Sequence, residues 1–303
     1  MSWFSTCCFA ILLQTCQSIA RERRLRTNLR DCCKLGVMQT PRPVSGLLYS
    51  GGKLVRAGQR SWNQMRRIEI TPRFISSAEG SALIRLGETQ VICTASIEDG
   101  VPSFLKGTGR GWITSEYAMI PRATETRTAR EATRGRQGGR TMEIQRLIGR
   151  SLRAITDLEA LGERTVWIDC DVIRADGGTR TASITGSLVA LGLGLRKLMD
   201  LKSLSHVPLH DYVAAISVGI VSGDMLLDLD YAEDANAEVD MNVVMTGSGD
   251  LVEVQATAEG RPYSSQDLNA MLDLARPGIK ELLDVQKSIL NFDLSKQSSK
   301  AKI

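Results

Sequence analysis

The sequence predicts an α+β fold made of two similar halves. Paired strand-like segments followed by a long helix occur twice along the chain, an order that is typical of this class. No linker rich in Pro, Gly or Ser separates the halves, so we expect a single domain. A chain of 303 residues with 43% apolar and 24% charged residues has the composition of an ordinary globular protein.

The elements of the first half follow from the periodicity of its apolar residues. Alternation of apolar and polar residues predicts strands, and recurrence every three or four positions predicts a helix from Thr141. The last segment of this half is almost wholly apolar, so we expect a buried helix. In order, the elements are a hairpin of residues 81–85 and 90–96, a strand near 112–119, the helix from Thr141, a strand at 166–173 and the buried helix at 182–199.

The second half repeats the pattern with two hairpins and one helix. The hairpins pair residues 212–221 with 225–229 and residues 239–246 with 251–257. Ser264 or Ser265 should cap a helix that runs to about residue 290, since serine is a favoured N-cap. Pro277 should bend this helix.

The two ends of the chain differ from the part between them. Residues 1–54 hold five of the seven cysteines and an apolar run that is too short to span a bilayer. Arginines follow that run, the reverse of a secretory signal. We interpret residues 1–54 as a disordered extension, either a transit-like segment or the product of a start codon assigned too far upstream. Residues 55–292 form the expected domain, and 293–303 a polar tail.

Cysteine usage indicates the compartment of this domain. It keeps only Cys93 and Cys170, both in apolar strands, which is typical of a cytoplasmic protein. Import into an organelle is the alternative if residues 1–54 are translated. We expect no association with a membrane.

Charge is unevenly distributed, although the net charge is only +4. Residues 110–153 contain ten arginines and four glutamates, without lysine or aspartate, whereas residues 228–259 contain no basic residue. Either run alone is most simply a solvated face, but together they favour one surface for polyanions and another for a cation. An aromatic content of 5% disfavours a protein that binds single strands by base stacking.

A glycine-rich turn separates the expected strand at 166–173 from the buried helix. Its sequence is Asp176-Gly177-Gly178-Thr179-Arg180-Thr181. The glycines permit a tight turn, and the threonine, the arginine and the start of a helix supply donors for a small oxyanion. An ordinary strand-to-helix turn with a threonine cap is the alternative interpretation.

Six segments between residues 55 and 290 share their sequence and order with a known family. They are residues 107–114 (GTGRGWIT), 116–124 (EYAMIPRAT), 139–150 (GRTMEIQRLIGR), 168–172 (IDCDV), 176–180 (DGGTR) and 237–242 (AEVDMN). The chain closely resembles the bacterial ribonuclease PH family.

This resemblance implies the ribonuclease PH fold (ribosomal protein S5 domain 2-like), with mixed sheets and helices packed between and beside them. It implies a homohexamer assembled as a trimer of dimers. It also implies trimming of tRNA precursors beyond the CCA end, and of rRNA 3′ ends, by phosphorolysis that releases nucleoside diphosphates. The reverse reaction adds nucleotides to RNA 3′ ends.

The resemblance also assigns site residues. It implies that inorganic phosphate, the co-substrate, is bound by Arg140, Gly178, Thr179 and Arg180. It implies that Arg180, Asp234 and Asp240 are catalytic, and that RNA is bound by Arg110, Arg122, Arg127 and Arg130.

Carboxylates suit Mg²⁺ or Mn²⁺, so Asp234 and Asp240 are expected metal ligands. Protonation of the leaving 3′ oxygen by one aspartate is the alternative role. Without the family, Arg140 and both aspartates would be interpreted as solvated loop residues.

Three other functions fit the sequence less well. A non-catalytic, RNA-binding ring subunit of an exosome-like assembly would not need Arg140, the glycine turn and both aspartates. A P-loop hydrolase would need G-x-x-x-x-G-K-[ST], which does not occur. Polynucleotide phosphorylase carries two copies of the domain and appended RNA-binding domains, whereas one copy is present here.

Overall fold

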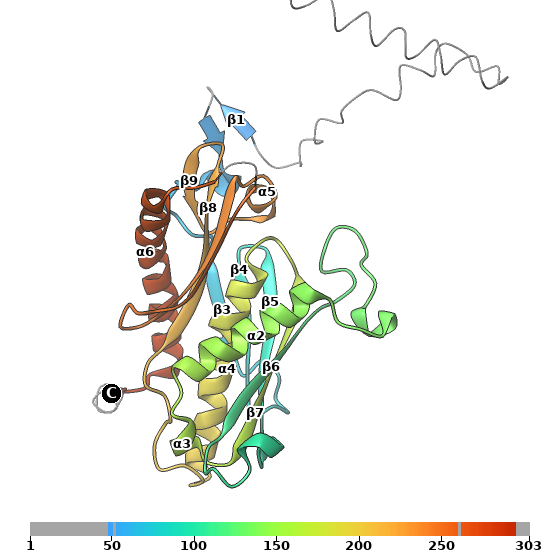
Figure 1. Ribbon diagram of the computed structural model, residues 1–303, viewed down its shortest axis with the longest axis vertical. Helices are drawn as coiled ribbons and strands as arrows, with labels where there is room; N and C mark the ends of the chain where they lie inside the picture. The colour runs from blue at the N-terminus through green and yellow to red at the C-terminus, as the bar shows by residue number, and fades with distance from the viewer. Residues whose placement is uncertain (1–47, 51–52, 260–261, 295–303) are drawn as a thin grey trace, which may run out of the picture. The chain divides into compact units, whose positions relative to one another are not determined.

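A computed structural model describes residues 48–50, 53–259 and 262–294. These residues all belong to the second of the two units into which the chain divides, Ser45–Ile303. Two β-sheets and the helices beside them make up the domain (Figure 1). The five-stranded sheet has the order β3-β4-β5-β7-β6, and the four-stranded sheet has the order β11-β10-β8-β9.

The five-stranded sheet is mixed, and its one parallel pair determines where the site lies. Strands β6 and β7 run in parallel, with Met119 opposite Val172, so both end at the same edge. The other pairs in this sheet are antiparallel. Its strands are β3 (Ile68–Pro72), β4 (Gly80–Leu86), β5 (Thr89–Asp99), β6 (Trp112–Met119) and β7 (Arg164–Arg174).

The four-stranded sheet is wholly antiparallel. Its strands are β8 (Val213–Val221), β9 (Asp224–Leu227), β10 (Val239–Thr246) and β11 (Leu251–Ala258). The short helix α5 (Tyr231–Asp234) connects β9 to β10, and the long helix α6 (Ser265–Leu290) follows β11. A capping box formed by Ser264 and Asp267 begins α6, which contains Pro277.

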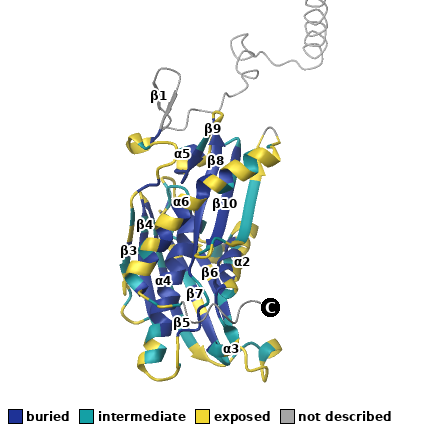
Figure 2. Ribbon diagram, turned by 90° about the vertical axis from the view of Figure 1, so that its left-hand side faces the viewer, coloured by how far each residue is buried: buried dark blue, intermediate teal, exposed yellow. Residues whose placement is uncertain are grey.

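Helix α4 (Thr179–Asp200) forms the centre of the core. It packs on β4 and β5 of one sheet and on β8 of the other, and residues 181–195 are buried without a break (Figure 2). The approach is close, since a Cβ on Gly80 would lie 2.0 Å from the Ala190 carbonyl oxygen. Helix α2 (Gly139–Ala154) covers β6 with the stripe of Ile144, Leu147, Ile148 and Leu152.

The structure agrees with the predicted order of elements and corrects three details. Helix α2 begins at Gly139, so Arg140 lies in its first turn and not before it. Asp234 ends the helix α5, where the sequence predicted a loop. Strand β3, helix α5 and helix α3 (Leu158–Leu161) were not predicted, because four or five residues carry too little periodicity.

The described residues reach only part of the predicted extension and tail. Strand β1 (Leu48–Ser50) pairs with β2 (Lys53–Val55), so the boundary predicted after residue 54 falls inside β2. The predictions for residues 1–47 and 295–303 concern segments outside the described residues. Within the part that the structure describes, no helix is long and apolar enough to cross a membrane.

Candidate active site

The glycine turn lies at the edge where β6 and β7 end. Gly177 and Gly178 have φ of 73° and 65°, which disfavours any residue with a Cβ. A Cβ on Gly177 would also lie 2.6 Å from the Leu229 carbonyl oxygen, so the turn packs directly on the backbone before α5. Helix α4 begins at Thr179, and its first N–H groups and dipole give this edge a partial positive charge.

Tyr117 of β6 supports the threonine of this turn. Its hydroxyl lies 2.8 Å from Thr179 Oγ1, and both residues are buried. Burial raises the pKa of Tyr117, while the hydrogen bond from Thr179 and the charges of Arg140 and Arg180 act in the opposite direction. The two arginines therefore lie within electrostatic range of the same phenol.

The starts of α2 and α4 bring these two guanidinium groups together. Arg180 is half-buried, and its Nη1 donates a hydrogen bond of 3.1 Å to Gln255 Oε1 and lies 4.0 Å from Glu143 Oε1. Arg140 is exposed, in the first turn of α2. The arrangement has the donors that a small oxyanion requires.

The two aspartates face the arginines from the second half of the chain. Asp234 ends α5, and Asp240 lies in β10, where its Oδ1 accepts a hydrogen bond from Thr257 Oγ1. Loss of solvation and then the charge of Asp240 raise the pKa of Asp234, whereas Arg140 and Arg180 lower it. Asp234 is exposed in the single chain, so water weakens each of these effects. Asp234, Asp240, Arg140 and Arg180 thus form one electrostatic group.

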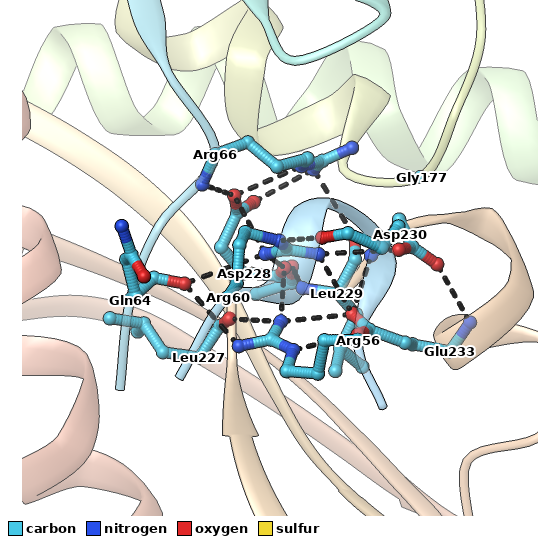
Figure 3. Close-up of polar contacts among 12 residues, drawn as sticks. Arg56, Arg60, Gln64, Arg66, Gly177, Leu227, Asp228, Leu229, Asp230 and Glu233 are labelled. Atoms are coloured by element: carbon cyan, nitrogen blue, oxygen red, sulfur yellow. Dashed lines mark hydrogen bonds and ion pairs between the residues drawn. The ribbon is translucent and has the colours of Figure 1, made fainter. Parts of the chain in front are cut away.

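A buried network of ion pairs surrounds the start of α5, the helix that ends at Asp234 (Figure 3). Arg56 Nε lies 2.7 Å from Glu233 Oε1, and Arg60 Nη2 lies 3.2 Å from Asp230 Oδ2. Asp230 and Glu233 also form the capping box of α5. The network thereby fixes the helix that ends at Asp234. The sequence did not predict this network, because its paired residues lie 177 and 170 positions apart.

The aspartate pair suits a divalent cation whose other ligands come from a substrate and from water. Among the described residues, no group of three or more His, Cys, Asp or Glu side chains could hold a metal ion. Mg²⁺ is commonly bound by one or two carboxylates together with substrate phosphates and water. Asp234 and Asp240 meet that requirement.

The predicted RNA-binding arginines lie in two places. Arg122, Arg127 and Arg130 are exposed on the segment between β6 and α2, the green segment that projects from the domain in Figure 1. Arg110 is exposed just before β6, at the opposite end of that strand from the glycine turn. Eight residues of strand span roughly 26 Å, so one chain does not bring Arg110 to the turn.

The donors and carboxylates gathered here suit chemistry on phosphate groups. Models of the 3′ exoribonuclease family match the chain, domain 1 over residues 64–193 and domain 2 over residues 211–278. The chain belongs to the 3′ exoribonuclease family. Membership confirms the predicted enzyme class, and the two matched domains correspond to the two halves of the fold.

Comparison with individual proteins gives the same result. The chain is 57% identical to ribonuclease PH of Moorella thermoacetica over 237 residues, which cover 78% of this chain and 95% of that protein. It is 59% identical to ribonuclease PH of Bacillus pumilus over 236 residues, 98% of that protein. The predicted resemblance to bacterial ribonuclease PH is confirmed.

Solved structures confirm the fold. Rice Rrp46 is 20% identical, with a TM-score of 0.64 over 78% of this chain and all of that one. A subunit of the Archaeoglobus fulgidus exosome with RNA bound to the active site is 23% identical, with a TM-score of 0.65 over 76% of this chain and 92% of that one.

Proposed function

We propose that the chain is a phosphorolytic 3′–5′ exoribonuclease and nucleotidyltransferase. Inorganic phosphate attacks the phosphorus of the last phosphodiester of an RNA, and the bond from that phosphorus to the 3′ oxygen of the penultimate nucleotide breaks. The terminal nucleotide is released as a nucleoside diphosphate, and the RNA is one nucleotide shorter. The reverse reaction extends RNA 3′ ends. The observation that carries this proposal is the convergence of Arg140, Thr179 and Arg180 with the pair Asp234 and Asp240.

The glycine turn and the arginines bind the attacking phosphate. Phosphate is already an anion near neutral pH, so no base is required to activate it. The enzyme must instead hold it against a second phosphate of like charge. The guanidinium groups of Arg140 and Arg180, the Thr179 hydroxyl and the N–H groups at the start of α4 supply that stabilisation.

The aspartates act on the leaving side. Asp234 and Asp240 would hold Mg²⁺ or Mn²⁺, which supplies Lewis-acid stabilisation of the phosphates and of the departing 3′ oxygen. Proton donation by one aspartate is the alternative, and a pH–rate profile separates the two roles.

RNA reaches this site along the arginines. Arg110, Arg122, Arg127 and Arg130 contact phosphates of the backbone, which gives affinity without sequence choice. The substrates are tRNA precursors beyond the CCA end and rRNA 3′ ends. Residues 55–292 act as the catalytic domain within a cytoplasmic homohexamer, a trimer of dimers. The relatives named ribonuclease PH support these assignments.

The test is digestion of a tRNA that carries a short 3′ tail, with and without inorganic phosphate. We expect nucleoside diphosphates that require phosphate and disappear in Arg180→Ala and Asp240→Ala. Release of monophosphates would indicate hydrolysis and overturn the mechanism. Binding of RNA without release would favour the non-catalytic ring subunit.

A further inference from the structure

Arg66 connects the two parts of the active site. It lies just before β3, and its side chain is only 6% exposed (Figure 3). One partner is Asp228, which precedes α5 in the second half of the chain. The other is Asp176, which opens the glycine turn in the first half.

On the side of the aspartates, Arg66 makes a bidentate contact with Asp228. Arg66 Nε and Nη2 donate to the two carboxylate oxygens of Asp228 at 2.9 and 2.7 Å. The backbone N–H of Arg66 donates to the same carboxylate at 2.7 Å, and Nη2 also donates to the Leu229 carbonyl at 3.2 Å. Only a planar guanidinium has this fork of donors, which an ammonium group cannot reproduce.

On the side of the phosphate turn, the same guanidinium binds Asp176. Its Nη1 donates to the Asp176 carbonyl oxygen and lies 3.9 Å from the Asp176 carboxylate. A Cβ on Gly178 would lie 3.1 Å from Arg66 Nη2, so the turn passes directly over the guanidinium. The backbone N–H of Tyr231, in α5, donates to Asp176 Oδ1 at 3.4 Å.

The backbone of Asp228 indicates that this contact is constrained. Asp228 has φ of 56° and is fully buried; this left-handed conformation is uncommon outside glycine, and aspartate and asparagine are among the residues that accept it best. Three N–H groups of Arg66 hold the carboxylate in this conformation. The bend at Asp228 directs the chain into α5.

We infer that Arg66 is a positioning residue that fixes the distance between the phosphate turn and Asp234. It reaches neither reactant and acts through Asp176 and Asp228. The inference rests on the proposed function, because in-line transfer requires the phosphate and the aspartates to be held at one spacing. Misplacement by about 1 Å can cost roughly a hundredfold in rate.

Two variants test this role. Arg66→Lys keeps the charge and loses the bidentate contact with Asp228. Asp228→Asn keeps the shape of the side chain and tolerates positive φ, but it loses the charge that binds Arg66. For both we expect kcat on tailed tRNA, per folded molecule, to fall by about a hundredfold and KM for phosphate to rise. Folded protein is measured by circular dichroism and by gel filtration.

The control is Arg153→Lys. Arg153 donates a 2.7 Å hydrogen bond to the Ile113 carbonyl and stacks on Trp112 at 4.4 Å, at the far end of β6. This variant loses a part-buried guanidinium contact that is remote from the glycine turn, and we expect its kcat and KM per folded molecule to match the wild type.

Two results would overturn the inference. One is kcat and phosphate KM at wild-type values in the variants. The other is a loss of activity in strict proportion to the loss of folded protein, with KM unchanged, which would make Arg66 merely structural. If Arg66→Lys does not fold, Asp228→Asn decides by the same criteria. A wild-type protein that releases no diphosphates would overturn the proposed function itself, so the two failures are distinguishable.

Discussion

At the scale of single residues, Asp234 illustrates a conflict between stability and function. Its pKa is raised by loss of solvation and by the charge of Asp240. A carboxyl whose pKa is higher in the folded chain binds its proton more tightly there. Its contribution to stability therefore falls as the pH rises from the ordinary aspartate pKa of about 3.9 through the raised value. At neutral pH the ionised Asp234 destabilises the fold.

We therefore predict opposite effects of Asp234→Asn on the two properties. Phosphorolysis should fall by about a hundredfold or more, because a group that stabilises the transition state is lost. The free energy of unfolding at pH 7 should rise by no more than about 1 kcal/mol, since Asp234 is solvent-exposed. The Tm at pH 7 should rise slightly with it. The gain should shrink toward acidic pH. Thermal denaturation of both proteins from pH 4 to 8 measures this gain in stability. A Tm of Asp234→Asn below that of the wild type at pH 7 would contradict the repulsion between Asp234 and Asp240.

Thr179 allows a second prediction for a single group. Thr179→Val is nearly isosteric and removes the hydroxyl that lies 2.8 Å from Tyr117. If this hydroxyl binds phosphate, KM for phosphate should rise roughly tenfold to a hundredfold, because hydrogen bonds to charged groups are worth about 1.5–3 kcal/mol. Thr179→Ser should restore it.

Tyr117→Phe is the matched control for that experiment. It keeps the hydroxyl of Thr179 and removes only its buried partner. We expect a smaller change in KM for phosphate than in Thr179→Val. Equal changes in the two variants would mean that the pair serves packing and not phosphate binding.

Some site residues are predictable from sequence because their signal is local. Gly177, Gly178 and Thr179 form a turn between a recognisable strand and a recognisable helix, and the structure places a helix start there. Tyr117 and Arg66 have no such signal. Tyr117 meets Thr179 only because β6 pairs in parallel with β7, and Arg66 meets Asp228 across 162 residues of sequence. A buried arginine cannot be told from an exposed one before its partner is known.

At the scale of elements, α5 depends on a segment far away in the sequence. Four residues are too few for a stable isolated helix, so its contacts must hold it. Arg56 and Arg60 supply them through Glu233 and Asp230. The same dependence explains why α5 was not predicted, whereas the 22 residues of α4 were recognised from composition alone.

This dependence predicts where the functional domain begins. A chain starting at Val55 keeps Arg56 and Arg60, and should retain activity and assembly. A chain starting at Ser61 leaves Glu233 and Asp230 buried without their cations. Breaking a buried pair in this way costs about 3–5 kcal/mol. Urea denaturation and digestion of tailed tRNA compare the two proteins. Loss of activity in the longer one would show that residues before 55 are needed.

At the scale of the whole molecule, the projecting segment begins beside the glycine turn of its own chain, where the Ala175 N–H donates to the Ala123 carbonyl at 2.8 Å. Arg122, Arg127 and Arg130 are exposed on it, and the segment extends away from the sheets (Figure 1). Large apolar side chains are exposed in loops (Trp62 and Phe74), in α5 (Tyr231) and in β11 (Leu251). In the proposed homohexamer, we expect the segment of one subunit to guide RNA toward the active site of a neighbour.

Mixed oligomers test this arrangement. The double variant Arg127→Ala, Arg130→Ala should bind tailed tRNA weakly, and Asp240→Ala should be inactive. If the arginines act on the neighbouring subunit, oligomers formed from equal amounts of the two should regain activity. A working site needs an intact Asp240 in one subunit and intact arginines in the next. Random mixing of symmetric assemblies therefore gives about a quarter of the wild-type sites.

A matched mixture makes that result decisive. Arg180 and Asp240 belong to one site within one chain. Oligomers of Arg180→Ala with Asp240→Ala should therefore gain no sites by mixing, and any recovery there would mean exchange with wild-type protein. Recovery only in the first mixture places the arginines across the subunit interface. The salt dependence of KM for RNA should also be weaker in the double arginine variant than in the wild type, because fewer phosphates are neutralised. Absence of recovery from mixed oligomers of confirmed composition would assign the arginines to the site of their own chain.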